Sequence, residues 1–255
     1  VLEAPPGSVN LDLFLVRHHA EIYHLCRRRP LQTNLPERAL PVLELMGERF
    51  PNRELALIEL GSSFGLLGRV ACAAGRDGWD YIGLFEPGQQ MPRVFPRVTV
   101  YRGIDRSPPD AAWAMACIPH ASVRLRTERF IKELPVGQEC TVNRGSALDL
   151  PQHPAVMELI PRFNLRHPEP LIPVVLTSFL LSRLKPSKRL LLARLARQFA
   201  AANGGAWINQ DFETDDAAEA LHDQTPALPR PCKVWLDGEP RLVLDSEYCR
   251  SWLMV

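Results

Sequence analysis

Short apolar runs alternate with longer amphipathic segments along most of the 255-residue chain. A run that is apolar at nearly every position predicts a strand covered on both faces, because such a strand has no side left for water. On this pattern, and on β-branched residues, we predict five core strands. They are Leu55–Ile58, Val98–Asp105, a strand and turn over Glu139–Leu150, Pro173–Phe179 and Ala206–Glu213.

Segments with apolar residues three or four positions apart separate these strands and predict helices. The most strongly patterned segment is Ser187–Gly205, in which Asn203 and Gly204 are typical of a helix C-terminus. The other predicted helices are residues 11–29, Thr33–Phe50, the segment after residue 65 as far as Ala74, and His120–Leu134.

The order of these elements predicts an α/β protein with one mostly parallel sheet. Near the end, Asp237-Gly238 separates two alternating runs, which predicts an antiparallel hairpin at one edge of the sheet. The two helices before the first strand predict an N-terminal helical cap over residues 1–52 and a core over residues 53–255. Residues 78–97 mix strand and turn signals, so they form either a β-hairpin insertion or the second sheet strand itself.

Composition narrows the class of partner. With 30 Lys and Arg against 29 Asp and Glu, the net charge is +1, which favours neither a nucleic-acid backbone nor an acidic membrane surface. Apolar runs stay well short of the ~18 residues that a membrane span needs. The first ten residues resemble neither a signal peptide nor a transit peptide. We therefore expect a cytoplasmic protein without a nucleic-acid or membrane partner.

Neither the cysteines nor the histidines form a metal-binding pattern. The six cysteines are scattered without a CxxC pair, which is typical of reduced thiols in a cytosolic protein. His19 and His24 lie five positions apart, so they would not share one face of a helix. We predict no metal site.

The stretch with the strongest chemical signal is Ala56–Gly68. Its apolar run ends in an acid, Glu59, and a turn then precedes residues that can begin a helix. The turn consists of Gly61, Ser62, Ser63, Phe64 and Gly65. Glycine lets the backbone approach a ligand closely, and the free amides at a helix start face it, so this layout favours a nucleotide-like ligand. The alternative is an ordinary strand-to-helix turn that needs glycine only for its dihedral angles.

Within this stretch, ELGSSFGLL resembles the first motif of class I S-adenosylmethionine-dependent methyltransferases, in which an acid precedes a GxGxG pattern. More closely, the chain is similar to a bacterial family of unknown function with a methyltransferase-like core. The shared pieces, in order, are TNLPER, ELGSSFGL, YRGIDRSPPD, RGSALDL and VVLTSFLLSRLKPSKR. The resemblance implies a Rossmann-like methyltransferase fold and S-adenosylmethionine as the cofactor.

The resemblance also implies which residues contact the cofactor. It assigns Glu59, Gly61, Ser63 and Gly65 to the methionine end, with Ser62 in the same loop, Asp105 to the ribose, Ser146 and Ala147 to the adenine, and Ser178 and Phe179 to the methyl-transfer face. Spacing alone favours another acid for the ribose, because Glu86 follows Gly65 at the interval typical of a dinucleotide fold. The YRGID match favours Asp105, whose carboxylate can accept hydrogen bonds from both ribose hydroxyls. We adopt Asp105.

The resulting hypothesis is a methyltransferase that acts on a small-molecule acceptor. Methyl transfer from a sulfonium is an in-line displacement that depends mainly on positioning, so no catalytic triad is required. The fourth strand ends in TSF rather than the Asn/Asp-Pro-Pro-Tyr/Phe of enzymes that methylate amino groups of bases, which argues against a nucleic-acid acceptor. The candidate acceptor-contacting residues are Tyr23, His19, Asp211 and Glu213.

Two other hypotheses stay open. Ser63 replaces the middle glycine of GxGxG, Ser146 stands where the family often has an acid, and the C-terminal SEYCRSW lacks the histidines that the family tends to carry. These departures favour a protein that binds S-adenosylmethionine as a sensor or scaffold without turnover. A nicotinamide-dependent oxidoreductase is the third hypothesis, and the terminal hairpin argues against it.

Overall fold

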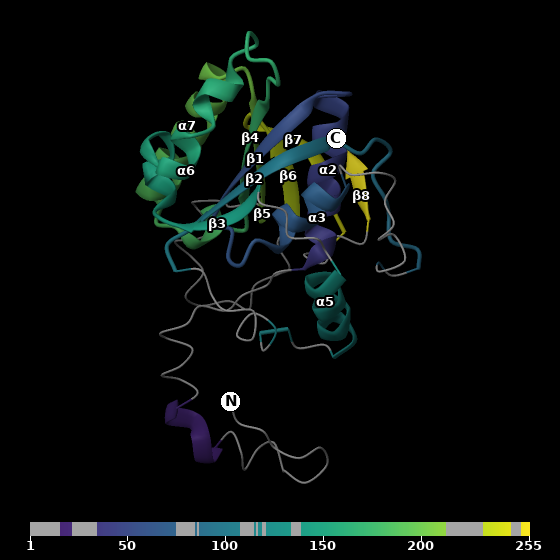
Figure 1. Ribbon diagram of the computed structural model, residues 1–255. Coiled ribbons are helices and arrows are strands. Elements are labelled where there is room, and N and C mark those ends of the chain that lie inside the picture. The colour runs from purple at the N-terminus through teal and green to yellow at the C-terminus, as the bar shows by residue number, and fades with distance from the viewer. Residues whose placement is uncertain are drawn as a thin grey trace.

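Eight strands make a single sheet, and all five predicted core strands are among them. A computed structural model describes residues 16–21, 35–74, 85, 87–107, 115, 117–118, 121–133, 139–212, 232–245 and 251–255 (Figure 1). The strands are β1 (Glu54–Leu60), β2 (Arg97–Asp105), β3 (Cys140–Arg144), β4 (Ile172–Ser178), β5 (Ala206–Phe212), β6 (Cys232–Leu236), β7 (Glu239–Leu244) and β8 (Trp252–Met254).

The helices occupy the segments between the strands. They are η1 (Pro36–Arg38), α2 (Ala39–Arg49), α3 (Leu66–Ala74), α5 (Ala121–Glu133), η3 (Ala147–Gln152), α6 (Pro154–Met157), η4 (Ile160–Phe163), η5 (Leu181–Arg183) and α7 (Pro186–Ala202), where η denotes a 3-10 helix. Of the helix predicted over 11–29, residues 16–21 are described and are helical. In the stretch 78–97, the described residues before β2 form turns and coil, and the remainder lies outside the described part of the chain.

The sheet joins a parallel half to an antiparallel half, in the order β3-β2-β1-β4-β5-β6-β7-β8. Strands β1 to β5 pair in parallel, and β5 to β8 pair antiparallel. Asp237 and Gly238 join β6 to β7 with φ values of 53° and 93°, so the predicted hairpin is confirmed. The first five strands follow the doubly wound order, which reverses direction between β1 and β4.

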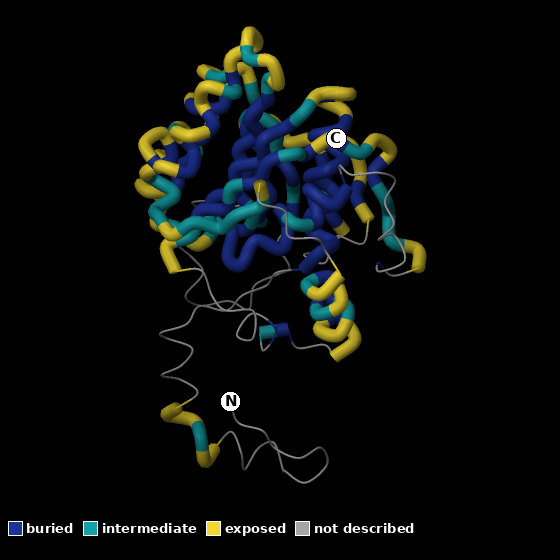
Figure 2. The backbone as a smooth tube through the Cα atoms, viewed as in Figure 1, coloured by how far each residue is buried: buried dark blue, intermediate teal, exposed yellow. Residues whose placement is uncertain are grey.

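Two apolar layers cover the parallel half, which explains why its central strands β1 and β4 are mostly apolar. Leu55 and Leu57 of β1 belong to the hydrophobic cluster that includes α2 and α3, whereas Ala56 and Ile58 belong to the cluster that includes α7. The burial is visible in Figure 2, where the central strands are dark blue and the outer turns of the helices are yellow. Helix α2 shares a hydrophobic cluster with α3 and the sheet, so it belongs to the helical layer on that face of the sheet.

No described helix combines the length and the apolar character that crossing a membrane requires.

Candidate functional site

The loop after β1 has the conformation that its glycines suggest. Gly61, Ser63 and Gly65 all have positive φ values, of 76°, 53° and 79°. A Cβ atom on Gly61 would lie 2.9 Å from Cδ1 of Leu180, and one on Gly65 would lie 2.6 Å from Cγ2 of Val142. Glycine is therefore needed at both positions for dihedral angles and for space. Ser63 adopts the left-handed conformation although it has a side chain, which costs on the order of 1 kcal/mol.

Asp105 ends β2 directly beside this loop. Its Oδ2 accepts a hydrogen bond from the backbone N–H of Ser63 at 2.8 Å, and its Oδ1 accepts one from the N–H of Ser107 at 2.9 Å. These two amides fix the orientation of the carboxylate. Since a carboxylate oxygen has two lone pairs, each oxygen can still accept a hydrogen bond from a ligand.

A cavity of about 250 Å³ lies at the carboxyl ends of β1, β2 and β3. It brings together residues that the sequence predicted as cofactor contacts, namely Gly61, Asp105, Ser146 and Ala147. The Oγ of Ser146 accepts the N–H of Leu148 at 3.2 Å and thereby caps η3. The cavity also touches the point where the strand order reverses, which is the usual ligand site of an open parallel sheet.

The opposite wall of this cavity was not among the predicted contacts. It consists of Leu180, Leu184, Lys188 and Leu192 from η5, α7 and their flanking residues. The sequence VVLTSFLLSRLKPSKR contains these residues, but only their spacing on the folded η5 and α7 shows which of them face the cavity. Arg106, which follows Asp105, also lines the cavity and gives it a second positive charge in addition to that of Lys188.

Glu59 lies on the other face of the sheet from this cavity. It is 4% exposed and its Oε2 accepts a hydrogen bond from the hydroxyl of Tyr101 at 2.7 Å. The pKa of Glu59 is raised from 4.5 to about 8: burial is the largest cause, the Tyr101 hydrogen bond opposes it, and the negative charge of Asp105 adds to it. Burial and the neighbouring Glu59 likewise raise the pKa of Tyr101. Glu59 is not among the residues that line the cavity.

Besides Glu59, five predicted cofactor contacts are not among the residues that line the cavity, namely Ser62, Ser63, Gly65, Ser178 and Phe179. Ser62 and Ser63 are buried in the loop, at 1% and 3% exposure. The Ser178 hydroxyl donates to Oε1 of Gln210 at 2.9 Å. Phe179 has a φ of 50°, and its ring packs under the guanidinium of Arg38 at 3.9 Å, in the cluster formed with α2 and α3.

The predicted acceptor-contacting residues are not gathered at one place among the described residues. His19 is exposed on the helix over residues 16–21. Asp211 is 1% exposed and accepts hydrogen bonds from the N–H groups of Ser182 at 3.0 Å and Phe212 at 2.9 Å, and its burial raises its pKa. Tyr23 and Glu213, together with the alternative ribose ligand Glu86, lie outside the described residues.

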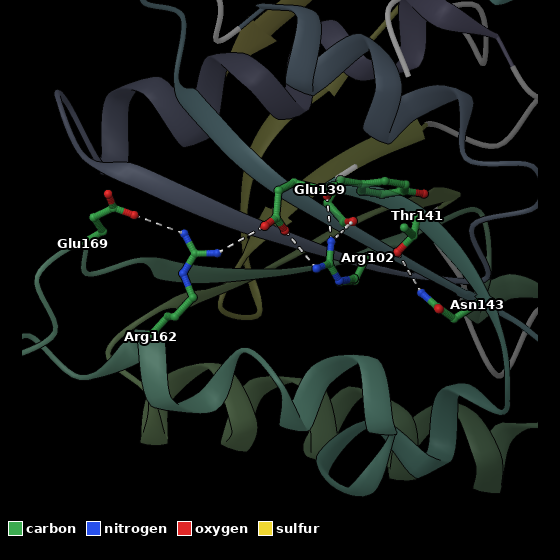
Figure 3. A network of polar contacts seen from close by, with 7 residues as sticks. Arg102, Glu139, Thr141, Asn143, Arg162 and Glu169 are labelled. Atoms are coloured by element: carbon green, nitrogen blue, oxygen red, sulfur yellow. Dashed lines mark hydrogen bonds and ion pairs between the residues drawn. The ribbon is translucent and has the colours of Figure 1, made fainter. Parts of the chain in front are cut away.

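A separate polar network lies along β2 and β3 (Figure 3). The Arg102 guanidinium donates to the backbone oxygen of Glu139 at 2.7 Å and to its carboxylate at 2.9 Å, and Arg162 approaches the same carboxylate at 3.7 Å. Glu169 lies 4.0 Å from Arg162. This network links β2 to the segment around η4, and its charges compensate each other, so its role is structural.

Among the described residues, no three His, Cys, Asp or Glu side chains are arranged to hold a metal ion.

Fold and cavity together define an α/β protein with a doubly wound parallel half and a cavity at its switch point. The chain belongs to a bacterial family, described as "Uncharacterized protein conserved in bacteria (DUF2332)", whose model matches residues 8–247. No curated protein matches the sequence. Among solved structures, one described as "DhpI-SAM-HEP complex" aligns over 89% of this chain and 76% of its own, at 12% identity and a TM-score of 0.34.

Proposed function

We propose that the protein binds S-adenosylmethionine in the 250 Å³ cavity and transfers its methyl group to a small-molecule acceptor. The observation that carries the proposal is the convergence of three loops on one cavity. Gly61 after β1, Asp105 after β2, and Ser146 with Ala147 after β3 all line it. These are the positions that the methyltransferase-like motifs ELGSSFGL, YRGID and RGSALDL single out.

The residues of the cavity fit the chemistry of this cofactor. Asp105 is held by two backbone amides and has a lone pair left on each oxygen, so it can accept hydrogen bonds from the two ribose hydroxyls. Leu180, Leu184 and Leu192 give an apolar wall for a flat adenine ring. Lys188 offers a positive charge that a carboxylate could pair with.

The chain's part in the reaction would be positioning. When bound, S-adenosylmethionine would supply the methyl group, and its sulfonium sulfur would leave as a neutral thioether. Asp105 and the glycine loop would fix the ribose and orient the reactive end, while the leucine wall would exclude water. Such positioning can account for much of the rate of an in-line displacement, and a general base is optional.

Isothermal titration with S-adenosylmethionine and with its demethylated product tests the binding step. We expect both to bind, and Asp105→Ala to weaken binding by about 10- to 100-fold, because hydrogen bonds to a charged group contribute about 1.5–3 kcal/mol. Glu239→Gln removes one exposed negative charge from β7 and serves as the matched control, with unchanged affinity. No affinity for either compound would overturn the proposal, and tighter binding of NAD or NADP would favour an oxidoreductase instead.

A binding protein without turnover is the second candidate. It is favoured by the position of Asp211, which holds the N–H groups of Ser182 and Phe212 and does not line the cavity. Incubation with methyl-labelled cofactor and a panel of phenol, amine, thiol and carboxylic acid acceptors separates the two candidates. Labelled product supports the methyltransferase, whereas tight binding with no product from any acceptor supports the sensor or scaffold.

A further inference from the structure

A second cavity, of about 320 Å³, lies along β5 and β6 on the α7 side of the sheet. Its polar and aromatic lining includes Ser182, Arg189, Trp207, Asn209, Asp211 and Trp235. The η5 turn separates it from the first cavity, because Leu180 and Leu184 line the first cavity and Leu181 lines the second. The two cavities therefore share no lining residue.

A relay of hydrogen bonds fixes the orientation of one amide in this second cavity. The indole N–H of Trp207 donates to Oγ1 of Thr177 at 3.2 Å, and the Thr177 hydroxyl donates to Oδ1 of Asn209 at 2.8 Å. Because the Thr177 oxygen already accepts the indole proton, its own proton is directed to Asn209. The Asn209 amide is thus oriented with Oδ1 toward Thr177 and its NH2 group toward the cavity.

The NH2 group of Asn209 makes no hydrogen bond with the described residues, so both of its N–H groups can donate to a ligand. Asn209 is 8% exposed, and within the described part of the chain this amide nitrogen donates to no acceptor. Nδ2 of Asn209 is not one of the fully buried polar atoms that lack a partner, so it is open to solvent through the cavity and is available to an acceptor on a ligand. This donor lies in a cavity that two tryptophans also line, which favours an aromatic ligand with a hydrogen-bond acceptor.

The charged groups of the cavity are already engaged in holding η5. Nε of Arg189 donates to the backbone oxygen of Leu181 at 3.1 Å, and its Nη2 donates to that of Leu184 at 3.3 Å. Asp211 accepts the backbone N–H of Ser182. Their opposite charges also compensate each other, so the cavity does not select a charged ligand.

We propose that this second cavity binds a neutral, planar aromatic molecule that carries a hydrogen-bond acceptor on its ring. Trp235, which is half-buried and lies opposite Asn209 in the β5–β6 register, supplies a flat surface for the ring. The NH2 group of Asn209 donates to the ring acceptor. The site does not depend on S-adenosylmethionine binding or methyl transfer.

Equilibrium dialysis of the full chain with quinoline and with naphthalene tests the proposal. The two molecules have the same bicyclic shape, and only quinoline has an acceptor nitrogen. We expect quinoline to bind about ten-fold more tightly, the effect of one net hydrogen bond. Asn209→Leu should abolish the preference, and Trp235→Ala should weaken both ligands.

The controls separate this site from the first cavity. Asp105→Ala should leave quinoline binding unchanged, and circular dichroism with thermal unfolding checks that each variant is folded. If Asn209→Leu does not fold, Trp235→Ala on the sheet surface still tests the location. Failure of the wild-type protein to bind quinoline, equal affinity for the two molecules, or a preference that persists in Asn209→Leu would each overturn the proposal.

Discussion

The carboxyl ends of β1 and β2 lie side by side, and each carries an acidic residue. The two residues differ in burial and in hydrogen-bond partners. Glu59 points to the α3 side, is 4% exposed, and meets a single phenol hydroxyl, that of Tyr101. Asp105 is only partly buried, faces the cavity and is held by two backbone amides. Both acids precede a turn, yet Glu59 is packed in the core and Asp105 lines the cavity.

The difference shows how strongly local surroundings decide the chemistry of a carboxyl group. One hydroxyl does not compensate for the removal of water around Glu59, so its pKa rises to about 8 and the proton stays bound at neutral pH. A neutral Glu59 is then a hydrogen-bonded core residue. Glu59 therefore stays in the core beside Tyr101, whereas the Asp105 carboxylate faces the cavity.

The largest effect on stability is expected from Gly68→Ala, which adds a methyl group against the Tyr101 ring that contacts Glu59. A Cβ on Gly68 would lie 2.0–2.2 Å from three atoms of the Tyr101 ring, so the ring would have to leave its position under α3 and its bond to Glu59. We expect a loss of about 3 kcal/mol or more in unfolding free energy, measured by urea denaturation. In a Tyr101→Ala background the same change should cost far less, since alanine is the better helix former. Equal costs in the two backgrounds would contradict the steric explanation.

Next in size, taken per pH unit, is a pH dependence of stability that comes from Glu59. Its pKa is about 8 in the folded protein against an ordinary value of 4.5, so the folded state binds the proton more tightly. The stabilisation is complete below about pH 4.5 and is lost as the pH rises through 8. Relative to Glu59→Gln, the wild-type protein should lose up to about 1.4 kcal/mol per pH unit within that window.

Urea denaturation at several pH values checks this slope. Tyr101→Phe should move the upper end of the window to higher pH, because the lost hydrogen bond is the interaction that lowers the pKa of Glu59. Parallel stability curves for wild type and Glu59→Gln would show that Glu59 is ionised in the folded state.

The smallest effect is expected on the Asp105 side, from Ser63→Gly. Glycine removes the strain of a left-handed serine but adds freedom to the unfolded chain, so the net gain should be at most about 1 kcal/mol. The backbone N–H that donates to Asp105 is retained. Asn52→Gly is the control: Asn52 also has a positive φ, of 58°, but asparagine tolerates this conformation better and the gain should be smaller. A loss of stability in Ser63→Gly would mean that the serine side chain makes contacts worth more than its strain.

The sequence predicts the sheet well because the signal for it is local. The central strands β1 and β4 are mostly apolar, the hairpin has an Asp-Gly turn, and α7 has apolar residues at helical spacing, so a short stretch of sequence is enough to predict each of them. The short edge strand β8 lacks such a signal and was missed. The position of Asp105 at the end of its strand was likewise predictable, because strand ends in a parallel sheet meet at one edge.

The partners of the site residues depend on contacts between distant parts of the chain. Nothing near Glu59 in the sequence indicates that Tyr101 will cover it, since the pairing arises from the β1–β2 register and from the absence of a side chain at Gly103. The same holds for Leu180, which closes the cavity by packing against Gly61. The roles of Tyr23, Glu213 and Glu86 stay predictions, because these residues lie outside the described part of the chain.

The central place of β1 in the sheet has a consequence during translation. One edge of β1 pairs with β2 soon after synthesis, but the other edge pairs with β4, so Leu55 waits for Ile172 to emerge from the ribosome. Until then an apolar strand has an open edge, which is a template for aggregation. Nascent chains that stall before β4 should therefore recruit chaperones more than complete chains do.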